Sequence, residues 1–301
     1  MAGIAYLGPK GTFSQAALIQ MSAAGLIPGS IPRGAPTLDE MPTDSTPGAL
    51  EAVRTGAADF ACVPIENSID GSVLPTLDSL AIDPALQVFA ELTLDVAFSI
   101  VVKPGAIGDN PAESVRTVAA FPVAAAQVRR WLAEHVPQAT VVPAISNAGA
   151  AEDVLNGRAD AGVSTALAAE LYGLSTLADG VVDEPNARTR FVLVGPPGPP
   201  PPPTGADRTS VVLRLENVPG ALVGALSEFA LRDIDLTRIE SRPTRVELGT
   251  YVFFLDCVGH IDDTAVAEAL DALRRRCTAV RYLGSWPMGS ASDDYDGEAK
   301  A

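Results

Sequence analysis

Three short segments of the chain bring together residue types that can bind an anion or transfer a proton. The first is Gly8–Ser14, with the sequence GPKGTFS. Its glycines allow backbone amides to approach a ligand, and a helix that starts behind it offers unpaired N–H groups to an anion. A tight turn in which Thr12 or Ser14 caps the helix accounts for the spacing equally well. The segment matches neither a dinucleotide-binding motif nor a Walker loop, so it does not indicate a nucleotide.

The second segment is Val63–Ser72, with the sequence VPIENSIDGS, at the end of an apolar stretch. Glu66, Asn67 and Ser68 place an acid beside hydrogen-bonding groups, and Gly71 permits the close approach of a ligand. The same residue types also form turns and helix caps. Their density directly after a buried strand favours a binding site.

The third segment is Asp183–Phe191, with the sequence DEPNARTRF. It holds Arg188 and Arg190, and basic residues are scarce here: residues 1–206 carry 10 of them against 21 acidic residues, a net charge of −11. The planar guanidinium fork suits a carboxylate ligand. The alternative is a salt bridge between domains, which we assign to Arg188 rather than to Arg190.

The composition gives little support to other kinds of chemistry. His135 and His260 are the only histidines and are interpreted as surface residues, so neither a Ser-His-Asp relay nor a histidine metal site is expected. Cys62, Cys257 and Cys277 lack metal-ligand spacing and are interpreted as buried or half-buried thiols in a reducing compartment. The formal net charge of −16 argues against nucleic acid as a partner.

Nothing in the chain predicts export or membrane insertion. The N-terminal MAGIAYLGPKG has neither the basic region nor the apolar run of a signal peptide, and the apolar stretch Leu94–Val102 is too short to span a bilayer. We therefore expect a cytoplasmic protein with no membrane contact.

Apolar and amphipathic stretches alternate up to residue 195, which predicts an α/β domain with a mostly parallel sheet. The expected strands are Ile4–Leu7, Phe60–Ile65, Val88–Val102, Val115–Ala119, Ala139–Ala144, Ala161–Val163 and Arg190–Val194. The expected helices are Ser14–Ala24, Ala49–Thr55, Leu74–Leu80, Val123–His135, Ala148–Leu155 and Ala166–Tyr172. The three polar segments follow or precede strands, where the ligand crevices of such sheets lie.

A proline-rich stretch, residues 196–206, separates this domain from a second one at residues 207–288. The stretch favours stiff polyproline II and is expected to pass changes from one domain to the other. The second domain has the pattern βαββαβ of a ferredoxin-like fold. Residues 289–301 are polar and acidic, and we expect them to be disordered.

In order and spacing, the segments GPKGTFS, PIENSIDGSV and NARTRF resemble the diagnostic segments of the prephenate dehydratase family, and the resemblance covers residues 3–194. It implies a catalytic domain at 1–195 with two lobes like those of periplasmic binding proteins, which we place at 1–90 with 177–195 and at 91–176. The chorismate mutase extension of bifunctional relatives is absent, so a monofunctional chain is expected. The chain departs from the family pattern at three positions: many members have a histidine where Phe98 and Phe121 stand, and a cysteine where Val128 stands.

Two segments of the second domain, Glu216–Leu222 (ENVPGAL) and Glu240–Pro243 (ESRP), resemble the ligand-binding motifs of the ACT regulatory domain. The resemblance implies that L-phenylalanine binds there as an allosteric effector, across the interface of a homodimer or within a homotetramer. The residues so assigned are Asn217, Val218, Pro219, Gly220, Ala221, Leu222, Glu240, Ser241, Arg242 and Pro243.

The resemblance also implies a reaction that converts prephenate to phenylpyruvate, water and carbon dioxide without a metal or a cofactor. Thr189 is then the catalytic donor to the departing hydroxyl, and Glu66 is the proton source if burial raises its pKa. We assign the following residues to substrate binding: Arg190, which holds a carboxylate, Phe191, Thr12, Phe13, Ser14, Asn67, Ser68 and Gly71. Arogenate dehydratase activity and a non-catalytic amino-acid sensor stay open as alternatives.

Overall fold

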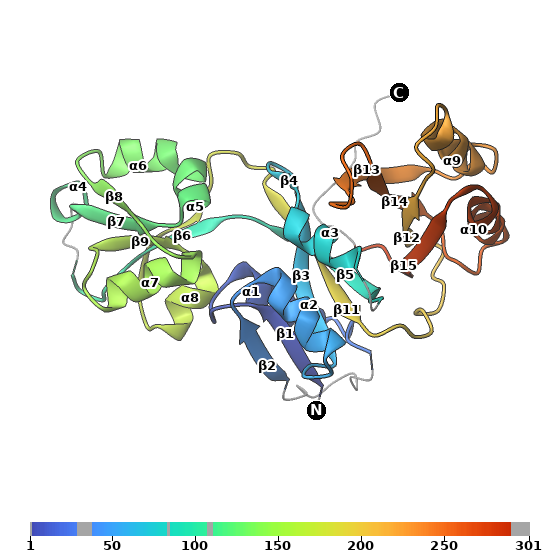
Figure 1. The fold of residues 1–301 in the computed structure, drawn as a ribbon. Coiled ribbons are helices and arrows are strands. Elements are labelled where there is room, and N and C mark those ends of the chain that lie inside the picture. The colour runs from blue at the N-terminus through green and yellow to red at the C-terminus, as the bar shows by residue number, and fades with distance from the viewer. Residues whose placement is uncertain (1, 29–37, 83–84, 107–110, 290–301) are drawn as a thin grey trace, which may run out of the picture.

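The computed structural model describes residues 2–28, 38–82, 85–106 and 111–289 of the chain. Figure 1 shows three units in a row: lobe one in the centre, lobe two at one end and the C-terminal domain at the other. Each unit is built around one sheet. The expected acidic tail lies outside the described residues, apart from its first residue, Gly289.

The sheet of lobe one has the strand order β2-β1-β3-β11-β5, with β4 paired to β3. Its strands are β1 (Gly3–Leu7), β2 (Asp39–Thr43), β3 (Phe60–Asn67), β4 (Gly71–Ser72), β5 (Gln87–Asp95) and β11 (Arg188–Gly195). Its helices are α1 (Phe13–Ala23), α2 (Thr46–Arg54) and α3 (Leu74–Leu80). Thr12 and Ser45 start α1 and α2 by capping a backbone N–H with their hydroxyl oxygens.

The sheet of lobe two has the order β10-β6-β9-β7-β8. Its strands are β6 (Phe98–Val102), β7 (Thr117–Ala120), β8 (Thr140–Pro143), β9 (Ala161–Ser164) and β10 (Ser175–Val181). Its helices are α4 (Pro111–Ser114), α5 (Pro122–Gln127), α6 (Arg129–His135), α7 (Asn147–Leu155) and α8 (Ala166–Leu171). The helix expected at Val123–His135 is therefore broken at Val128, whose φ of −123° and ψ of 15° are not helical.

The expectation of a mostly parallel sheet is only partly correct. β1 is parallel to β2 and β3, but β11 is antiparallel to both β3 and β5. The cause is the path of the chain: β5 leads out of lobe one and β11 leads back into it beside β5. Both sheets are therefore mixed, as β6 is also antiparallel to β9 and β10.

The strand pairing moves the expected limits of the lobes, which were residues 90 and 177. β5 stays hydrogen-bonded to β11 as far as Asp95, and β10 pairs with β6 of lobe two as far as Val181. The chain thus crosses between lobes just after Asp95 and again through residues 182–187. The strand expected over Val88–Val102 is two strands, one in each sheet, because alternation continues through the crossover.

The C-terminal domain has the expected order βαββαβ. Its elements are β12 (Asp207–Arg214), α9 (Ala221–Ala230), β13 (Leu236–Pro243), β14 (Tyr251–Val258), α10 (Thr264–Arg276) and β15 (Ala279–Pro287). The strands form one antiparallel sheet in the order β13-β14-β12-β15. One face packs on α9 and α10 around Phe229 and Leu270, and the other face is turned to lobe one.

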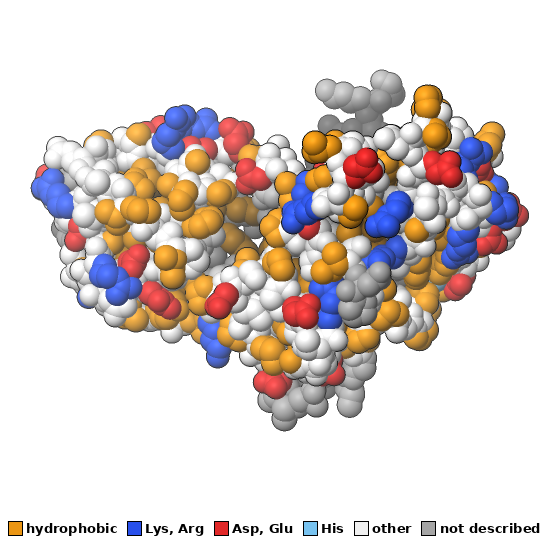
Figure 2. Space-filling model, viewed as in Figure 1, with side chains coloured by type: hydrophobic (Ala, Val, Ile, Leu, Met, Phe, Trp, Pro, Cys, Tyr) orange, Lys and Arg blue, Asp and Glu red, His pale blue; other side chains and the backbone are white. Residues whose placement is uncertain are grey.

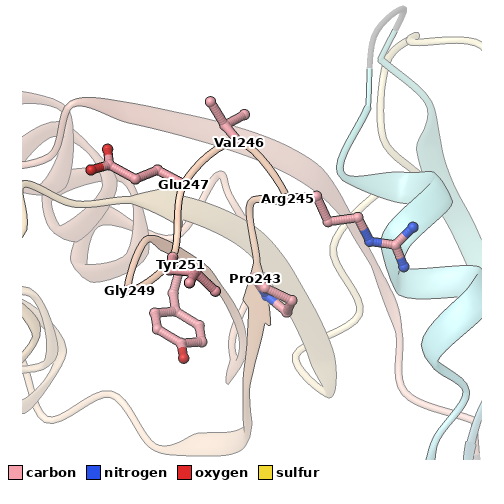
Figure 3. A pocket seen from close by; sticks show the side chains of 7 residues that line it. Pro243, Arg245, Val246, Glu247, Gly249 and Tyr251 are labelled. Atoms are coloured by element: carbon pink, nitrogen blue, oxygen red, sulfur yellow. The ribbon is translucent and has the colours of Figure 1, made fainter.

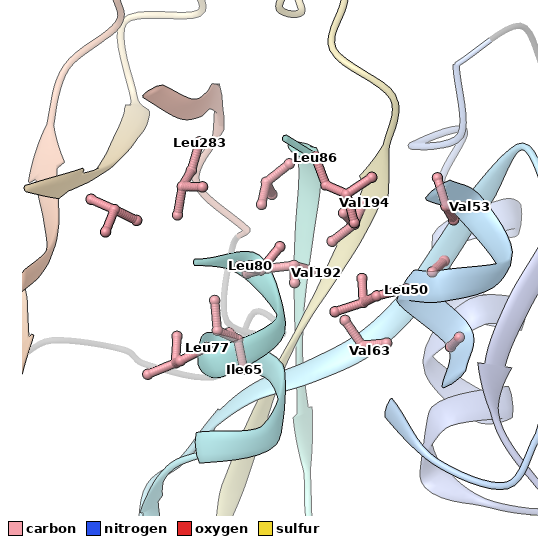
Figure 4. Close-up of a cluster of buried hydrophobic side chains, with 14 of the residues drawn as sticks. Leu50, Val53, Val63, Ile65, Leu77, Leu80, Leu86, Val192, Val194 and Leu283 are labelled. Carbon is pink, nitrogen blue, oxygen red and sulfur yellow. The ribbon is translucent and has the colours of Figure 1, made fainter. Parts of the chain in front are cut away.

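Lobe one and the C-terminal domain share a hydrophobic core. Phe254, Leu283 and Trp286 belong to the same buried cluster as Val88 and Val192 of lobe one. Figure 4 shows Leu283 among the leucine and valine side chains of lobe one. Strand β15 packs on β5 across this interface.

The proline-rich linker touches both of its neighbours. The backbone N–H of Gly198 donates to Gln87 Oε1 at 3.2 Å, and His260 Nε2 lies 3.0 Å from the carbonyl oxygen of Pro201. His260 is 0% exposed, so its expected surface position is wrong; its imidazole fills the space beneath the linker. His135 is exposed, as expected, and stacks on Trp131.

Candidate functional site

Thr189 lies in β11 at the edge of lobe one, next to the crossover to lobe two. Its neighbours across the sheet are Asn67 at the end of β3 and Leu94 near the end of β5. Asn67 Nδ2 donates a hydrogen bond to Thr189 Oγ1 at 2.9 Å. The Thr189 hydroxyl is thus an acceptor toward Asn67, and its own hydrogen is left to donate elsewhere.

The orientation of the Asn67 amide is fixed by the turn that follows it. Asn67 Oδ1 accepts hydrogen bonds from the backbone N–H groups of Ile69 and Asp70 at 2.8 and 2.9 Å. The Nδ2 group must therefore point toward Thr189. Gly71 closes the turn with a φ of +79°, a conformation that favours glycine.

Ser68 forms hydrogen bonds with the crossover that leads from lobe two back into β11. Its hydroxyl donates to the carbonyl of Asn186 at 2.9 Å and accepts from the backbone N–H of Arg188 at 2.8 Å. Its own N–H donates to the carbonyl of Arg188 at 2.8 Å. These bonds tie the turn after β3 to the start of β11, so Ser68 positions Thr189 through the backbone.

The loop Gly8–Ser14 lies at the start of α1, on the face of the sheet toward which Thr189 points. Alternate residues of a strand face opposite sides, so Thr189 shares a face with Phe191, which is packed under α1. Thr12 caps α1, and its hydroxyl donates to the Leu7 carbonyl at 2.9 Å. The first turn of α1 therefore directs its free N–H groups to the same end of the sheet as Thr189.

The same loop touches lobe two. Thr165 Oγ1 donates to the Gly11 carbonyl at 2.5 Å, and a Cβ on Gly11 would lie 2.9 Å from that of Ala168. The Phe13 ring meets Phe98 of lobe two edge-to-face at 5.7 Å between ring centres. Figure 2 shows the surface hollowed between the lobes, with hydrophobic side chains gathered over lobe two beside the hollow.

Arg190 points to the face of β11 opposite that of Thr189. Its Nε and Nη2 donate to Glu66 Oε2 at 3.1 and 2.8 Å, its Nη1 donates to Glu91 at 3.1 Å, and its Nη2 also donates to Asp256 at 2.9 Å. Burial opposes the charged form, but Asp256, Glu91 and Glu66 outweigh it and raise the pKa of the guanidinium above its usual value.

The ion pair between domains was expected at Arg188, and this expectation is wrong, because Arg190 makes it. Arg190 is 7% exposed and makes the ion pair between domains, whereas Arg188 pairs with Asp95 at 2.8 Å beside the crossover. The Arg190 guanidinium donates its hydrogen bonds to protein carboxylates, so it is not directed at a substrate. Sequence spacing gave no sign of this, because Asp256 lies 66 residues further along the chain.

The remaining expected site residues are divided between core and surface. Phe191 is 2% exposed and packs with Ile4 and Tyr6, so it belongs to the core of lobe one. Ser14 is 4% exposed in the first turn of α1. The Glu66 side chain is 39% exposed and accepts two hydrogen bonds from Arg190, which differs from the apolar burial that a proton source requires.

The C-terminal domain has a shallow cavity of about 190 Å³ at the start of α9. Its lining includes Asn217, Val218, Ala221 and Leu222 from the first ACT-type motif, together with Tyr251 of β14. Gly220, at the N-cap of α9, has a φ of +83°. The cavity therefore combines apolar side chains with the free N–H groups of a helix start.

The second ACT-type motif, Glu240–Pro243, faces lobe one. Ser72 Oγ donates to Glu240 Oε2 at 2.9 Å, and Arg242 pairs with Asp78 of α3 at 2.7 Å. Arg242 donates hydrogen bonds that lower the pKa of Asp78. A second cavity, of about 250 Å³, lies in the β13–β14 hairpin, and Figure 3 shows Arg245 reaching from its rim toward α3.

Within a single chain the two motifs do not line one cavity. Glu240, Ser241 and Arg242 are absent from both cavity linings, and Pro243 lines only the hairpin cavity. Within the described ranges, no group of His, Cys, Asp and Glu side chains is arranged to hold a metal ion. In the same ranges, no helix has the length and apolar character needed to cross a membrane.

Comparison with known proteins gives consistent matches. A family model described as prephenate dehydratase matches residues 4–198, and an ACT domain model matches residues 209–275. A prephenate dehydratase of Mycobacterium sp. (strain JLS) is 71% identical over 292 residues, which cover 97% of this chain and 91% of the relative.

Two solved structures are also similar over nearly the whole chain. The prephenate dehydratase of Arthrobacter aurescens in complex with L-Phe is 41% identical, with a TM-score of 0.84, and the match covers 95% of this chain and 90% of that one. A structure described as a novel type of quorum quenching acylase is 30% identical, with a TM-score of 0.81, and the match covers 96% and 98%.

Proposed function

This chain belongs to the prephenate dehydratase family, and we propose that it converts prephenate to phenylpyruvate, water and carbon dioxide between the two lobes, beside Thr189. In this reaction the bond from the ring to its carboxylate breaks and releases carbon dioxide. The electron pair moves through the ring and expels the C4 hydroxyl, which takes up a proton and leaves as water. Aromatisation of the ring supplies the driving force, so the protein has to orient the substrate and assist the leaving group.

The observation that carries the proposal is the hydrogen bond from Asn67 to Thr189. Since Asn67 Nδ2 occupies an acceptor site of the hydroxyl, the Thr189 hydrogen is available to the departing oxygen. A threonine hydroxyl is a weak acid, so Thr189 acts as a hydrogen-bond donor or relay rather than as the final source of the proton. Asn67 is accordingly a positioning residue.

Substrate carboxylates are proposed to bind at the start of α1. The free N–H groups of Phe13 and Ser14 lie at the positive end of the helix dipole, on the same face as Thr189. Lys10 is exposed in the same loop and adds a positive charge near this helix end. Arg190, which we expected in this role, has its guanidinium bonded to protein carboxylates.

A direct assay tests the proposal. The purified chain is incubated with prephenate and, separately, with arogenate, and the appearance of phenylpyruvate or phenylalanine is measured. Turnover of prephenate is expected; preferred turnover of arogenate would make the chain an arogenate dehydratase. No turnover of either would favour the sensor alternative, or another reaction on the same fold, as the name of the acylase neighbour illustrates.

We also propose that L-phenylalanine binds the C-terminal domain and inhibits the enzyme. The carboxylate would lie at the start of α9 and the ring against Val218, Ala221 and Leu222. Glu240 and Arg242 contact lobe one, but Ser241 and Pro243 are exposed on β13, an edge strand of its sheet, where a second copy of the chain can approach. A homodimer or homotetramer is therefore the proposed assembly, and the cytoplasm, which suits the free thiols of Cys62 and Cys257, is the proposed location.

Calorimetry with L-phenylalanine, alongside activity, tests the effector site. Gly220→Val should abolish binding and inhibition, because bulk at the N-cap covers the helix N–H groups. Gly173→Val is the matched control: this glycine also has a positive φ and an open Cβ position, but lies in lobe two. A wild type that neither binds phenylalanine nor responds to it would leave the domain with a role in assembly only.

A further inference from the structure

Six charged side chains meet between lobe one and the C-terminal domain; we call them the interdomain ion cluster. Lobe one supplies Glu66, Glu91 and Arg190, and the C-terminal domain supplies Arg208, Arg238 and Asp256. Glu91 and Asp256 are 3% and 1% exposed. Three carboxylates face three guanidiniums, which satisfies the requirement that buried ions be paired.

Asp256 lies at the centre of this cluster. Its Oδ2 is 2.9 Å from Arg190 Nη2 and 2.8 Å from Arg238 Nε, and its Oδ1 accepts from Arg238 Nη2 at 3.1 Å. Burial opposes its charge, but Arg238 and Arg190 lower the pKa of Asp256 below its usual range. Arg190 is therefore held by Glu66 on its own sheet and by Asp256 from the other domain.

The cluster sits directly behind the hydrogen bond between Asn67 and Thr189. Thr189 pairs with Asn67 across β11 and β3, and the next pair along the two strands is Arg190 with Glu66. The two pairs use opposite faces of the sheet. The register of β11 against β3 shifts between Arg190 and Phe191. The regular pairing of these two strands beyond the shift therefore does not fix how Thr189 meets Asn67 or how Arg190 meets Glu66.

We propose that Asp256 is a positioning residue for the dehydratase reaction. By holding Arg190, and through it Glu66, it fixes the register in which Asn67 meets Thr189. The inference rests on the proposed function of Thr189. A second contact supports the same path: Ser72 pairs with Glu66 in the sheet, and its hydroxyl donates to Glu240 of the C-terminal domain. The C-terminal domain thus contacts the region around the turn after β3 twice, through Asp256 and through Glu240.

The test is Asp256→Asn in the full chain, assayed with prephenate and without phenylalanine. The amide keeps the size of the side chain and loses its charge. A shift of about 1 Å at a catalytic group can cost about 10²-fold, so kcat is expected to fall roughly 10- to 100-fold with little change in KM. A wild-type kcat in a folded Asp256→Asn variant overturns the inference.

Two further sets of variants test whether Asp256 positions the catalytic group or only attaches the C-terminal domain to lobe one. Asp78→Asn removes two other interdomain ion pairs, those with Arg242 and Arg245, and should leave kcat near the wild-type value. Arg190→Lys should lower kcat as Asp256→Asn does, and the double variant should be no worse than the more impaired single one. Full additivity of the two effects, or an equal loss of kcat in Asp78→Asn, contradicts the proposal.

Folding and function are checked independently. If Asp256→Asn does not fold, Asp256→Glu keeps the charge, displaces it by one methylene, and should still lower kcat; wild-type turnover in this variant would overturn the inference. If wild-type protein does not convert prephenate, the proposed function fails first. If wild-type protein does so and Thr189→Ala does not, the function stands, and the Asp256 variants alone decide the positioning role.

Discussion

Lobe one is joined to its two neighbours in different ways. Toward lobe two, the described residues include two crossovers, the edge-to-face contact of Phe13 with Phe98, the close approach of Gly11 to Ala168, and a hydrogen bond from Thr165 to Gly11. Toward the C-terminal domain there is a shared hydrophobic core and the interdomain ion cluster. The first junction has few contacts to break, and the second buries large apolar side chains and paired charges.

The two junctions therefore suit different roles: one allows the lobes to move, and the other passes a change in the C-terminal domain to lobe one. A junction that depends on two crossovers can open and close around a substrate, as hinged domains do. A junction with a continuous core moves as one body, so a change in the C-terminal domain reaches β3 and β11 directly. We expected the proline linker to carry that change; the direct interface offers a shorter path, through Asp256 and Arg190.

The largest expected effect lies at the lobe junction. Thr189→Ala should lower kcat roughly 10²- to 10⁴-fold, because assistance to the departing hydroxyl is lost, with a smaller effect on substrate binding. Thr189→Ser keeps the hydroxyl and should retain much more activity. Steady-state kinetics with prephenate measures both variants, and near-normal turnover in the alanine variant would remove Thr189 from the mechanism.

The second effect concerns the shared core. Phe254 is 0% exposed in the cluster that joins lobe one to the C-terminal domain, so Phe254→Ala should cost about 3–5 kcal/mol of unfolding free energy at that junction. The two tryptophans report separately, since Trp286 is in this core and Trp131 is in lobe two. Denaturation followed in single-tryptophan variants should show the loss at Trp286 and a smaller one at Trp131. Equal losses at both would mean that the lobes unfold as one unit.

A third prediction concerns opening of the lobes. In the slow Thr189→Ala variant, bound prephenate should slow amide hydrogen exchange in the crossover 182–187, by up to about 100-fold at about 100 times the dissociation constant. Strand β15 at the other junction should show little change. Equal protection at both junctions would contradict a hinge confined to the lobe junction.

The sequence predicts the polar segments and most elements, because both depend on local patterns. The order βαββαβ follows from periodicity, and the cap at Thr12 is one of the two that the sequence offered. Helix α2 starts at Ser45, before the expected Ala49, so that cap was missed. The crossover after Asp95 could not be predicted, since alternation runs through it unbroken. The role of Arg190 could not be predicted either, because it depends on a partner in another domain. One signal was available: Asp256 is an acidic residue inside the apolar run YVFFLDCV, which indicates a buried charge that needs a partner.

The smallest effect tests how much the peripheral ion pairs of Asp78 with Arg242 and Arg245 add to the rigid junction. Asp78 has a lowered pKa in the folded chain because Arg242 donates hydrogen bonds to it, so its contribution to stability is present above the ordinary aspartate pKa of about 3.9 and is lost as pH falls through the lower folded value. Asp78→Asn should therefore lower the unfolding free energy at pH 7 by about 0.5–1 kcal/mol, since the pairs are partly exposed and screened by water. Urea denaturation of both proteins between pH 7 and pH 3 measures the difference, which should shrink only below pH about 4. A difference that persists unchanged at pH 3 would mean that the asparagine disturbs packing at α3 rather than removing a charge.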